Sequence, residues 1–229
     1  AKAFDNRPTI IEIKTVIGYG APNCGESSVH GKPLTEDDIK TLRNNLEFDS
    51  LPFSIKPEVK AYYKEHVIDR GSATNSNWNY MMSSYAKKYN EDYEMLNKYM
   101  FNDFTFEDYD DLPSFEVFTS LSTRVLMGKV LDGASTKLPN LIGGSADLTA
   151  STMVKGADGI FSRTNRSGRN IKFGVREHAM AAIANGLSID GSLKGFCSGF
   201  FVFSDYMKPA VRLAAIMHTP TLYLFSHDS

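Results

Sequence analysis

The second half of the chain alternates short apolar runs with segments of helical periodicity, and this alternation restricts the folds available to it. The apolar runs predict strands at residues 141–142, 171–173, 193–197 and 221–225. The intervening segments predict helices at 115–130, 176–187 and 203–217. Ser114 is the expected N-cap of the first of these helices, and Gly133 its expected stop. Strands that alternate with helices favour a parallel sheet, so we predict an α/β fold with helices on both faces of that sheet.

The first hundred residues carry a less regular pattern. Residues 9–15 alternate and are rich in β-branched side chains, so they predict a strand, which a glycine-rich loop follows. Thr35, with Asp38 three residues later, predicts the N-cap of a short helix that ends near residue 46. Another helix is predicted from Pro57 to about residue 67, and one helix or two over residues 75–100. One strand and a few helices make a partial α/β segment rather than a complete domain.

An acidic stretch between Phe101 and Pro113 predicts the boundary between two domains. Its carboxylates are Asp103, Glu107, Asp108, Asp110 and Asp111. Acidic runs of this kind are typical of solvated linkers. We predict a first domain over residues 1–110 and a second over residues 111–229. The chain begins without Met, and its last predicted strand ends where a loop of a site would begin, so we expect both ends to belong to a larger protein.

Composition excludes several classes of protein. A net charge of −2 over 229 residues gives no reason to expect nucleic acid or an anionic membrane as a partner. No run approaches the roughly 20 apolar residues of a transmembrane helix. Cys24 and Cys197 are the only cysteines, which predicts neither a disulfide framework nor a metal cluster and favours the cytoplasm. The five histidines share no ligand spacing, so we predict no metal site within this chain.

Glu177 is the strongest single candidate for a functional residue. It lies between Arg176 and His178, directly after a predicted strand and the turn at Gly174. The first turn of a helix favours a carboxylate, and open α/β sheets bind ligands beyond the carboxyl ends of their strands. The sequence pattern alone leaves a second interpretation open, in which Glu177 is an ordinary charge at a helix start.

Other candidates lie in loops and on one predicted helical turn. His30 and His227 each lie in a loop near the end of a predicted strand, where sites are common. Phe200, Phe203 and Tyr206 recur at three-residue spacing, which suits either a wall for a flat ring or an ordinary core face. No P-loop, dinucleotide-binding fingerprint or serine-hydrolase elbow is present.

Six segments in order resemble the transketolase family, and they extend along nearly the whole chain. They are I-K-T-V-I-G-Y-G-A-P (13–22), S-S-V-H-G-K-P-L (27–34), G-G-S-A-D-L-T-A-S (143–151), G-V-R-E-H-A-M (174–180), F-F-V-F-S-D-Y with P-A-V-R-L (200–213), and S-H-D-S (226–229). The resemblance implies the thiamine diphosphate-binding fold. It also implies transfer of a two-carbon ketol unit from a ketose phosphate to an aldose phosphate in the pentose phosphate pathway. The chain would then hold the end of the diphosphate-binding domain and most of the pyrimidine-binding domain. A homodimer with the active site at the subunit interface is implied as well.

The same resemblance assigns roles to particular residues. Glu177 would hydrogen-bond the aminopyrimidine ring of the cofactor and so promote loss of the proton from the thiazolium carbon. Phe200, Phe203 and Tyr206 would hold the pyrimidine, with Asp147 near the cofactor, and His30 would reach the reacting carbon and the substrate hydroxyls. The substrate phosphate would be bound by Arg124, Ser151 and His227.

Parts of the family pattern are missing from the chain. The motif that holds the divalent metal, Mg²⁺ or Ca²⁺, and the diphosphate is not in the sequence, so the metal ligands are expected outside it. Ser27 stands where other members often carry a histidine. We therefore expect the chain alone to be inactive. Two alternatives stay open, namely a related enzyme (dihydroxyacetone synthase or 1-deoxyxylulose-phosphate synthase) and a non-catalytic thiamine-fold dimerisation module.

Overall fold

The computed structural model describes residues 3–4, 6–104 and 112–228. The chain forms two compact units, Ala1–Asn79 and Tyr80–Ser229. The predicted boundary between residues 110 and 111 lies outside the described residues, as do the acidic residues from Glu107 to Asp111.

The second unit is built on a four-stranded parallel sheet, as the sequence predicts. Its strands are β1 (Leu141–Ser145), β2 (Asn170–Lys172), β3 (Lys194–Phe200) and β4 (Leu222–Ser226), in the order β2-β1-β3-β4. Every pairing is parallel. The central strand β1 brings its backbone close to both neighbours through Gly143 and Gly144. A Cβ on Gly143 would lie 1.9 Å from the Phe196 carbonyl oxygen, and one on Gly144 would lie 2.0 Å from that of Ile171.

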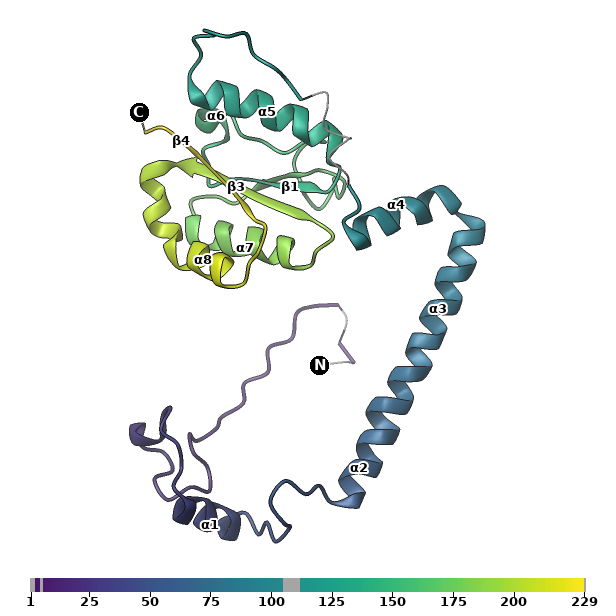
Figure 1. Cartoon of the computed structure of the whole chain (residues 1–229), viewed down its shortest axis with the longest axis vertical. Helices are drawn as coiled ribbons and strands as arrows, with labels where there is room; N and C mark the ends of the chain where they lie inside the picture. The colour runs from purple at the N-terminus through teal and green to yellow at the C-terminus, as the bar shows by residue number, and fades with distance from the viewer. Residues whose placement is uncertain (1–2, 5, 105–111, 229) are drawn as a thin grey trace. The chain divides into compact units, whose positions relative to one another are not determined.

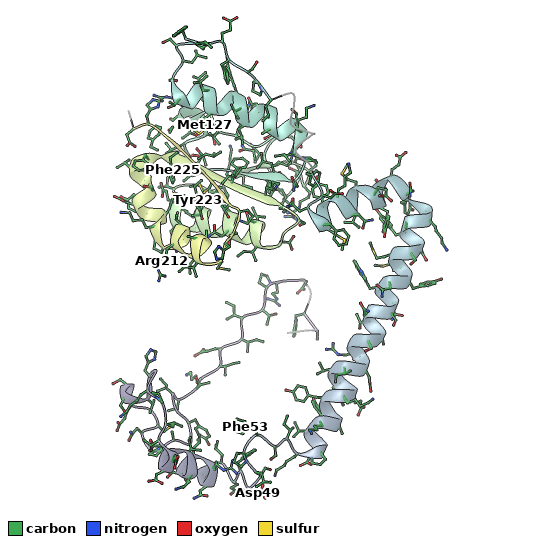
Figure 2. The ribbon with its side chains drawn as sticks, viewed as in Figure 1. Asp49, Phe53, Met127, Arg212, Tyr223 and Phe225 are labelled. Carbon is green, nitrogen blue, oxygen red and sulfur yellow. The ribbon has the colours of Figure 1, made fainter. Side chains whose placement is uncertain are left out.

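Helices cover the two faces of this sheet (Figure 1). On one face lie α5 (Thr123–Lys137) and α6 (Thr149–Thr152), and on the other α7 (Glu177–Ile189) and α8 (Ser204–Ile216). Each face has its own apolar core, because successive residues of a strand point to opposite sides. On β4, Tyr223 and Phe225 pack against the core on the side of α7 and α8, whereas Leu224 packs against the core on the other side, to which Met127 of α5 also belongs. Figure 2 labels Tyr223, Phe225 and Met127. The predicted α/β fold is confirmed.

The start and the end of α5 differ from the prediction. The segment from Phe115 to Leu121 is not helical, since Phe118 adopts a left-handed φ of 73° that no helix interior tolerates. The helix begins at Thr123 after Ser122 and runs through Gly133 to Lys137. Gly133 lies where a Cβ would come within 2.5 Å of the Pro113 ring, so its glycine permits close packing rather than ending the helix.

The first unit contains helices and irregular chain. The 3-10 turn η1 (Ser27–Val29) is followed by α1 (Glu36–Asn45), whose N-cap is Thr35 as predicted, and Thr35 and Asp38 form a capping box there. Further along are α2 (Pro57–Tyr63), the π-helical stretch η2 (Lys64–Asp69) and α3 (Arg70–Lys88). The helix α3 continues into the second unit, where a break at Tyr89 separates it from α4 (Asn90–Phe101), so the predicted "one helix or two" over 75–100 is two.

The predicted strand at residues 9–15 is wrong. No strand occurs among the described residues of the first unit, and Ile10, the most exposed of its isoleucines, is 94% exposed. A strand needs a neighbour to complete its backbone hydrogen bonds. Alternation of β-branched residues is therefore insufficient here, because the described part of this unit supplies no pairing partner.

Candidate functional site

The carboxyl ends of the parallel strands meet at one edge of the sheet and place several predicted site residues there. Asp147 follows β1, Glu177 follows β2 after a short turn, and His227 follows β4. Phe200 is the last residue of β3. Open α/β sheets bind ligands at this edge, which is where the sequence places its candidates.

A pocket of about 420 Å³ lies at this edge. Its walls are Ala146, Asp147, Leu148, Val175, Glu177, Phe203 and Tyr206. Four of these residues, Asp147, Glu177, Phe203 and Tyr206, are candidates from the sequence. Two carboxylates and two aromatic rings therefore line one cavity, together with apolar side chains.

Glu177 enters the pocket because of the turn that precedes its helix. Gly174 takes a left-handed φ of 66°, and Arg176 closes the turn by donating from Nη1 to the Phe173 carbonyl at 2.9 Å. Glu177 is the first residue of α7, where the helix dipole stabilises a negative charge. Within the described residues its carboxylate has no hydrogen bond or ion pair, although it is half-buried. The carboxylate is thus available to a ligand.

Three aromatic side chains form a stacked series beside it. The ring centroids of Phe200 and Phe203 are 6.2 Å apart with planes inclined by 16°, and those of Phe203 and Tyr206 are 6.3 Å apart with planes inclined by 26°. Tyr206 is 63% exposed, so this series is not the core face that the spacing also allowed. The nearly parallel rings offer a surface suited to a flat ligand.

Asp147 owes its position to a turn that the buried hydroxyl of Ser145 holds. Ser145 is 1% exposed, and its Oγ donates to the Ser198 carbonyl at 3.0 Å while accepting from the Leu148 N–H at 3.2 Å. Asp147 then takes a left-handed φ of 63° and presents an exposed side chain at the pocket.

The three residues predicted to bind phosphate come together in a second cluster. Arg124 donates from Nη2 to Nε2 of His227 at 2.9 Å and from Nη1 to the Ser151 carbonyl at 3.3 Å. Nδ1 of His227 lies 2.9 Å from Oγ1 of Thr123. The cluster joins the first turn of α5, the helix α6 and the chain after β4. A guanidinium in contact with an imidazole and with the backbone of a serine is suited to a phosphate.

His30 lies elsewhere in the chain. It belongs to the first unit, follows η1 as an exposed side chain, and is not among the residues that line the pocket.

Five further residues belong to these sites without having been singled out from the sequence. Ala146, Leu148 and Val175 line the pocket, Thr123 contacts His227, and Asp228 accepts a hydrogen bond from the Val202 N–H at 2.9 Å. Each is adjacent in sequence to a candidate or two residues from one. Their residue types carried no chemical signal of their own, so only adjacency could have identified them.

Two absences concern the described part of the chain. It contains no group of three His, Cys, Asp or Glu side chains arranged to hold a metal ion. None of its helices combines the length and apolar character needed to cross a membrane.

Comparison with known proteins identifies two matching family models. Residues 1–104 match the transketolase thiamine diphosphate binding domain, and residues 119–229 match the transketolase pyrimidine binding domain.

Relatives match over the full chain. The transketolase of Halalkalibacterium halodurans is 45% identical and that of Bacillus subtilis 40% identical, each across 100% of this chain. A solved transketolase from Leishmania mexicana superimposes with a TM-score of 0.87 at 33% identity, covering 97% of this chain and 33% of its own. A Pichia stipitis transketolase in complex with sedoheptulose-7-phosphate has a TM-score of 0.85 at 35% identity, covering 95% of this chain and 33% of its own. The chain spans 34% and 35% of the lengths of the two curated relatives.

Proposed function

The chain belongs to the transketolase family, and from this membership we propose that it works in a thiamine diphosphate-dependent transketolase. The reaction is the transfer of a two-carbon ketol unit from a ketose phosphate to an aldose phosphate, a step of the pentose phosphate pathway. The chain spans about a third of its relatives' length, so the activity is proposed for the full-length protein.

The pocket at the sheet edge fits the pyrimidine half of this cofactor. Its aromatic wall of Phe203 and Tyr206, preceded by Phe200, suits stacking against a flat ring. The carboxylate of Glu177 lines the same pocket and has no competing partner among the described residues. Asp147 adds a second carboxylate, which favours a ligand that carries positive charge. The single observation that carries the proposal is this convergence of Glu177, Asp147, Phe203 and Tyr206 on one cavity.

When bound, thiamine diphosphate supplies the carbanion chemistry of the reaction. The chain's own residues orient the cofactor and the substrate and hold protons beside them. Glu177 would hold a proton between its carboxylate and a nitrogen of the aminopyrimidine ring and so orient that ring. Phe200, Phe203 and Tyr206 would fix the ring plane and exclude water from one of its sides. His30 would hold a proton near the substrate hydroxyls.

Arg124, Ser151 and His227 would form the site for the phosphate of the sugar substrate, in which Arg124 donates to the phosphate oxygens and His227 holds the guanidinium in place. The arginine carries five N–H donors and uses two of its nitrogens in the contacts described above, so donors remain for phosphate oxygens. The sugar-phosphate complex of the Pichia stipitis relative supports a substrate of this class.

The remaining expectations complete the proposal. Mg²⁺ or Ca²⁺ would be held by ligands outside this chain. The protein would act as a cytoplasmic homodimer in which a second subunit covers the pocket and completes the active site. The predicted domains, residues 1–110 and 111–229, would correspond to the two cofactor-binding regions of such an enzyme, and the family models that match residues 1–104 and 119–229 support this division.

A coupled assay of the full-length protein with a pentulose phosphate and ribose 5-phosphate tests the function. We expect turnover in the wild type and its loss in Glu177→Ala, with only a small change in melting temperature, because Glu177 makes no hydrogen bond or ion pair within the described chain and its interaction with the helix dipole is weak. Absence of turnover in the wild type, or full turnover in Glu177→Ala, would refute the proposal. Activity only with formaldehyde, or only with pyruvate as donor, would instead identify one of the related enzymes.

A further inference from the structure

Thr123 occupies a place in the phosphate cluster that the proposed function does not explain. It is the first residue of α5, next to Arg124, and its hydroxyl lies 2.9 Å from Nδ1 of His227. His227 is 104 residues further along the chain, after β4. The contact therefore depends on the tertiary structure and joins a helix start to a strand end.

The direction of each hydrogen bond follows from the chemistry of arginine. A guanidinium can only donate, so Nε2 of His227, 2.9 Å from Nη2 of Arg124, must accept and carry no proton. A neutral imidazole then holds its proton on Nδ1, and this N–H donates to Oγ1 of Thr123. The two contacts together select one tautomer and one orientation of the ring.

Arg124 is in turn held at two points. Its Nη2 donates to the imidazole, and its Nη1 donates to the Ser151 carbonyl at 3.3 Å. Because the guanidinium is planar, two contacts define its plane and the directions of its remaining N–H groups. If the imidazole carried its proton on Nε2 instead, two donors would face each other and Arg124 would lose one of its two supports.

We infer that Thr123 is a positioning residue for phosphate recognition, which acts by holding His227 in the tautomer that orients Arg124. The inference rests on the proposed function, because it assigns the cluster to the substrate phosphate. Thr123 does not touch the phosphate in this role. Its effect on the substrate passes through His227 and Arg124.

The first experiment compares substrates that differ only in the phosphate, using the full-length enzyme. Thr123→Val keeps the shape of the side chain and removes the hydroxyl, whereas Thr123→Ser keeps the hydroxyl. For Thr123→Val we expect the KM for xylulose 5-phosphate to rise about 2- to 10-fold, the range that one lost hydrogen bond gives, with kcat unchanged. The KM for xylulose should not change, and Thr123→Ser should restore wild-type values. Thr136→Val, on the exposed side of the same helix, is the matched control.

The second experiment reads the tautomer directly and needs no activity. Nitrogen-15 NMR of the histidine side chains should show His227 protonated on Nδ1 in the wild type and in Thr123→Ser, and a mixture of tautomers in Thr123→Val. A wild-type His227 protonated on Nε2 would overturn the inference, even if no variant folded. An unchanged KM for xylulose 5-phosphate in a folded Thr123→Val would overturn it as well. If the wild type shows no transketolase turnover while the NMR result is as expected, the proposed function fails and the link between Thr123 and His227 stands.

Discussion

The backbone N–H of Val202 donates to Oδ1 of Asp228 over 2.9 Å, and this contact connects the two clusters of candidate residues. Val202 lies in the 3-10 turn η4 (Phe201–Phe203), whose last residue lines the pocket. Asp228 directly follows His227 of the phosphate cluster. In the dipeptide His227–Asp228, which follows β4, Asp228 thus supports the wall of the pocket and His227 carries the imidazole that contacts Arg124.

We predict that Asp228→Ala weakens cofactor binding. Loss of the acceptor leaves the start of η4 unsupported and releases Phe203 from its place in the stacked series, so the Kd of the full-length enzyme for thiamine diphosphate should rise at least about 3-fold. Calorimetric titration measures this value. Asp228→Asn keeps an acceptor oxygen and should stay within about 2-fold of the wild type. Asp132→Ala, an exposed carboxylate on α5, serves as the control. Equal affinities for Asp228→Ala and the wild type would show that this contact does not position Phe203.

Arg169 is predicted to stabilise the junction between α5 and the sheet. Its guanidinium donates to the Leu138 carbonyl at 2.6 Å, to the Ser135 carbonyl at 2.7 Å and to Asp158 at 2.6 Å, while the side chain is only 13% exposed. Arg169→Met should lower the free energy of unfolding by about 2–5 kcal/mol, because it strands carbonyl groups away from water. Urea denaturation of the full-length protein measures the loss.

Arg166 provides the matched control for that experiment. It is exposed, and its guanidinium lies 5.6 Å from the centre of the Phe161 ring. Arg166→Met should change the stability by no more than about 1 kcal/mol. Similar urea midpoints for the two variants would contradict the structural role assigned to Arg169.

Gly144 is predicted to tolerate no side chain. A Cβ at this position would lie 2.0 Å from the Ile171 carbonyl oxygen, so Gly144→Ala must push β2 away from β1. We expect a loss of about 3 kcal/mol or more, seen as a lower melting temperature or as insoluble protein. Gly199→Ala is the control on the neighbouring strand, because nothing lies within 4 Å of the Cβ it would add. A soluble Gly144→Ala with the wild-type melting temperature would disprove the close approach.

Cys197 is predicted to be inert in the folded protein. It is completely buried, and burial raises the pKa of its thiol from 9.0 to about 12, whereas Cys24 is exposed. A thiol reagent at pH 8, followed by mass spectrometry, should label Cys24 within minutes and Cys197 only after unfolding. Labelling of both at similar rates in the native protein would contradict the burial of β3.

The same pKa predicts how stability responds to alkaline pH. Between pH 9 and about pH 12 the unfolded thiol loses its proton while the folded one keeps it, so the unfolded state binds fewer protons. The contribution of Cys197 to stability is therefore complete below pH 9 and decreases as the pH rises towards 12. Chemical denaturation at a series of pH values measures this slope. Cys197→Ala removes the thiol and should make the slope shallower, and identical slopes would count against the assignment.

Features that depend on neighbouring residues could be predicted from the sequence. The capping box of Thr35 and Asp38, the four strands of the second unit and the start of α7 next to Glu177 all follow from patterns a few residues long. The candidate residues could be chosen in the same way, because motif and residue type indicate what chemistry a side chain can perform. The spacing of Phe203 and Tyr206 could not by itself predict whether they belong to a core or to the wall of a pocket, since it suits both. Only the family resemblance assigned them to the cofactor.

Tertiary structure decided whatever depends on residues distant in the chain. The strand expected at residues 9–15 does not form, because alternation cannot supply a pairing partner. The helix α5 continues through Gly133, where the missing Cβ leaves room for the Pro113 ring. Arg124 and His227 are 103 residues apart in sequence, but Nη2 of Arg124 lies 2.9 Å from Nε2 of His227, because the first turn of α5 lies beside the chain that follows β4. The sequence by itself thus determined which side chains are present and which local elements form, whereas the order of strands in the sheet decided which of those side chains meet.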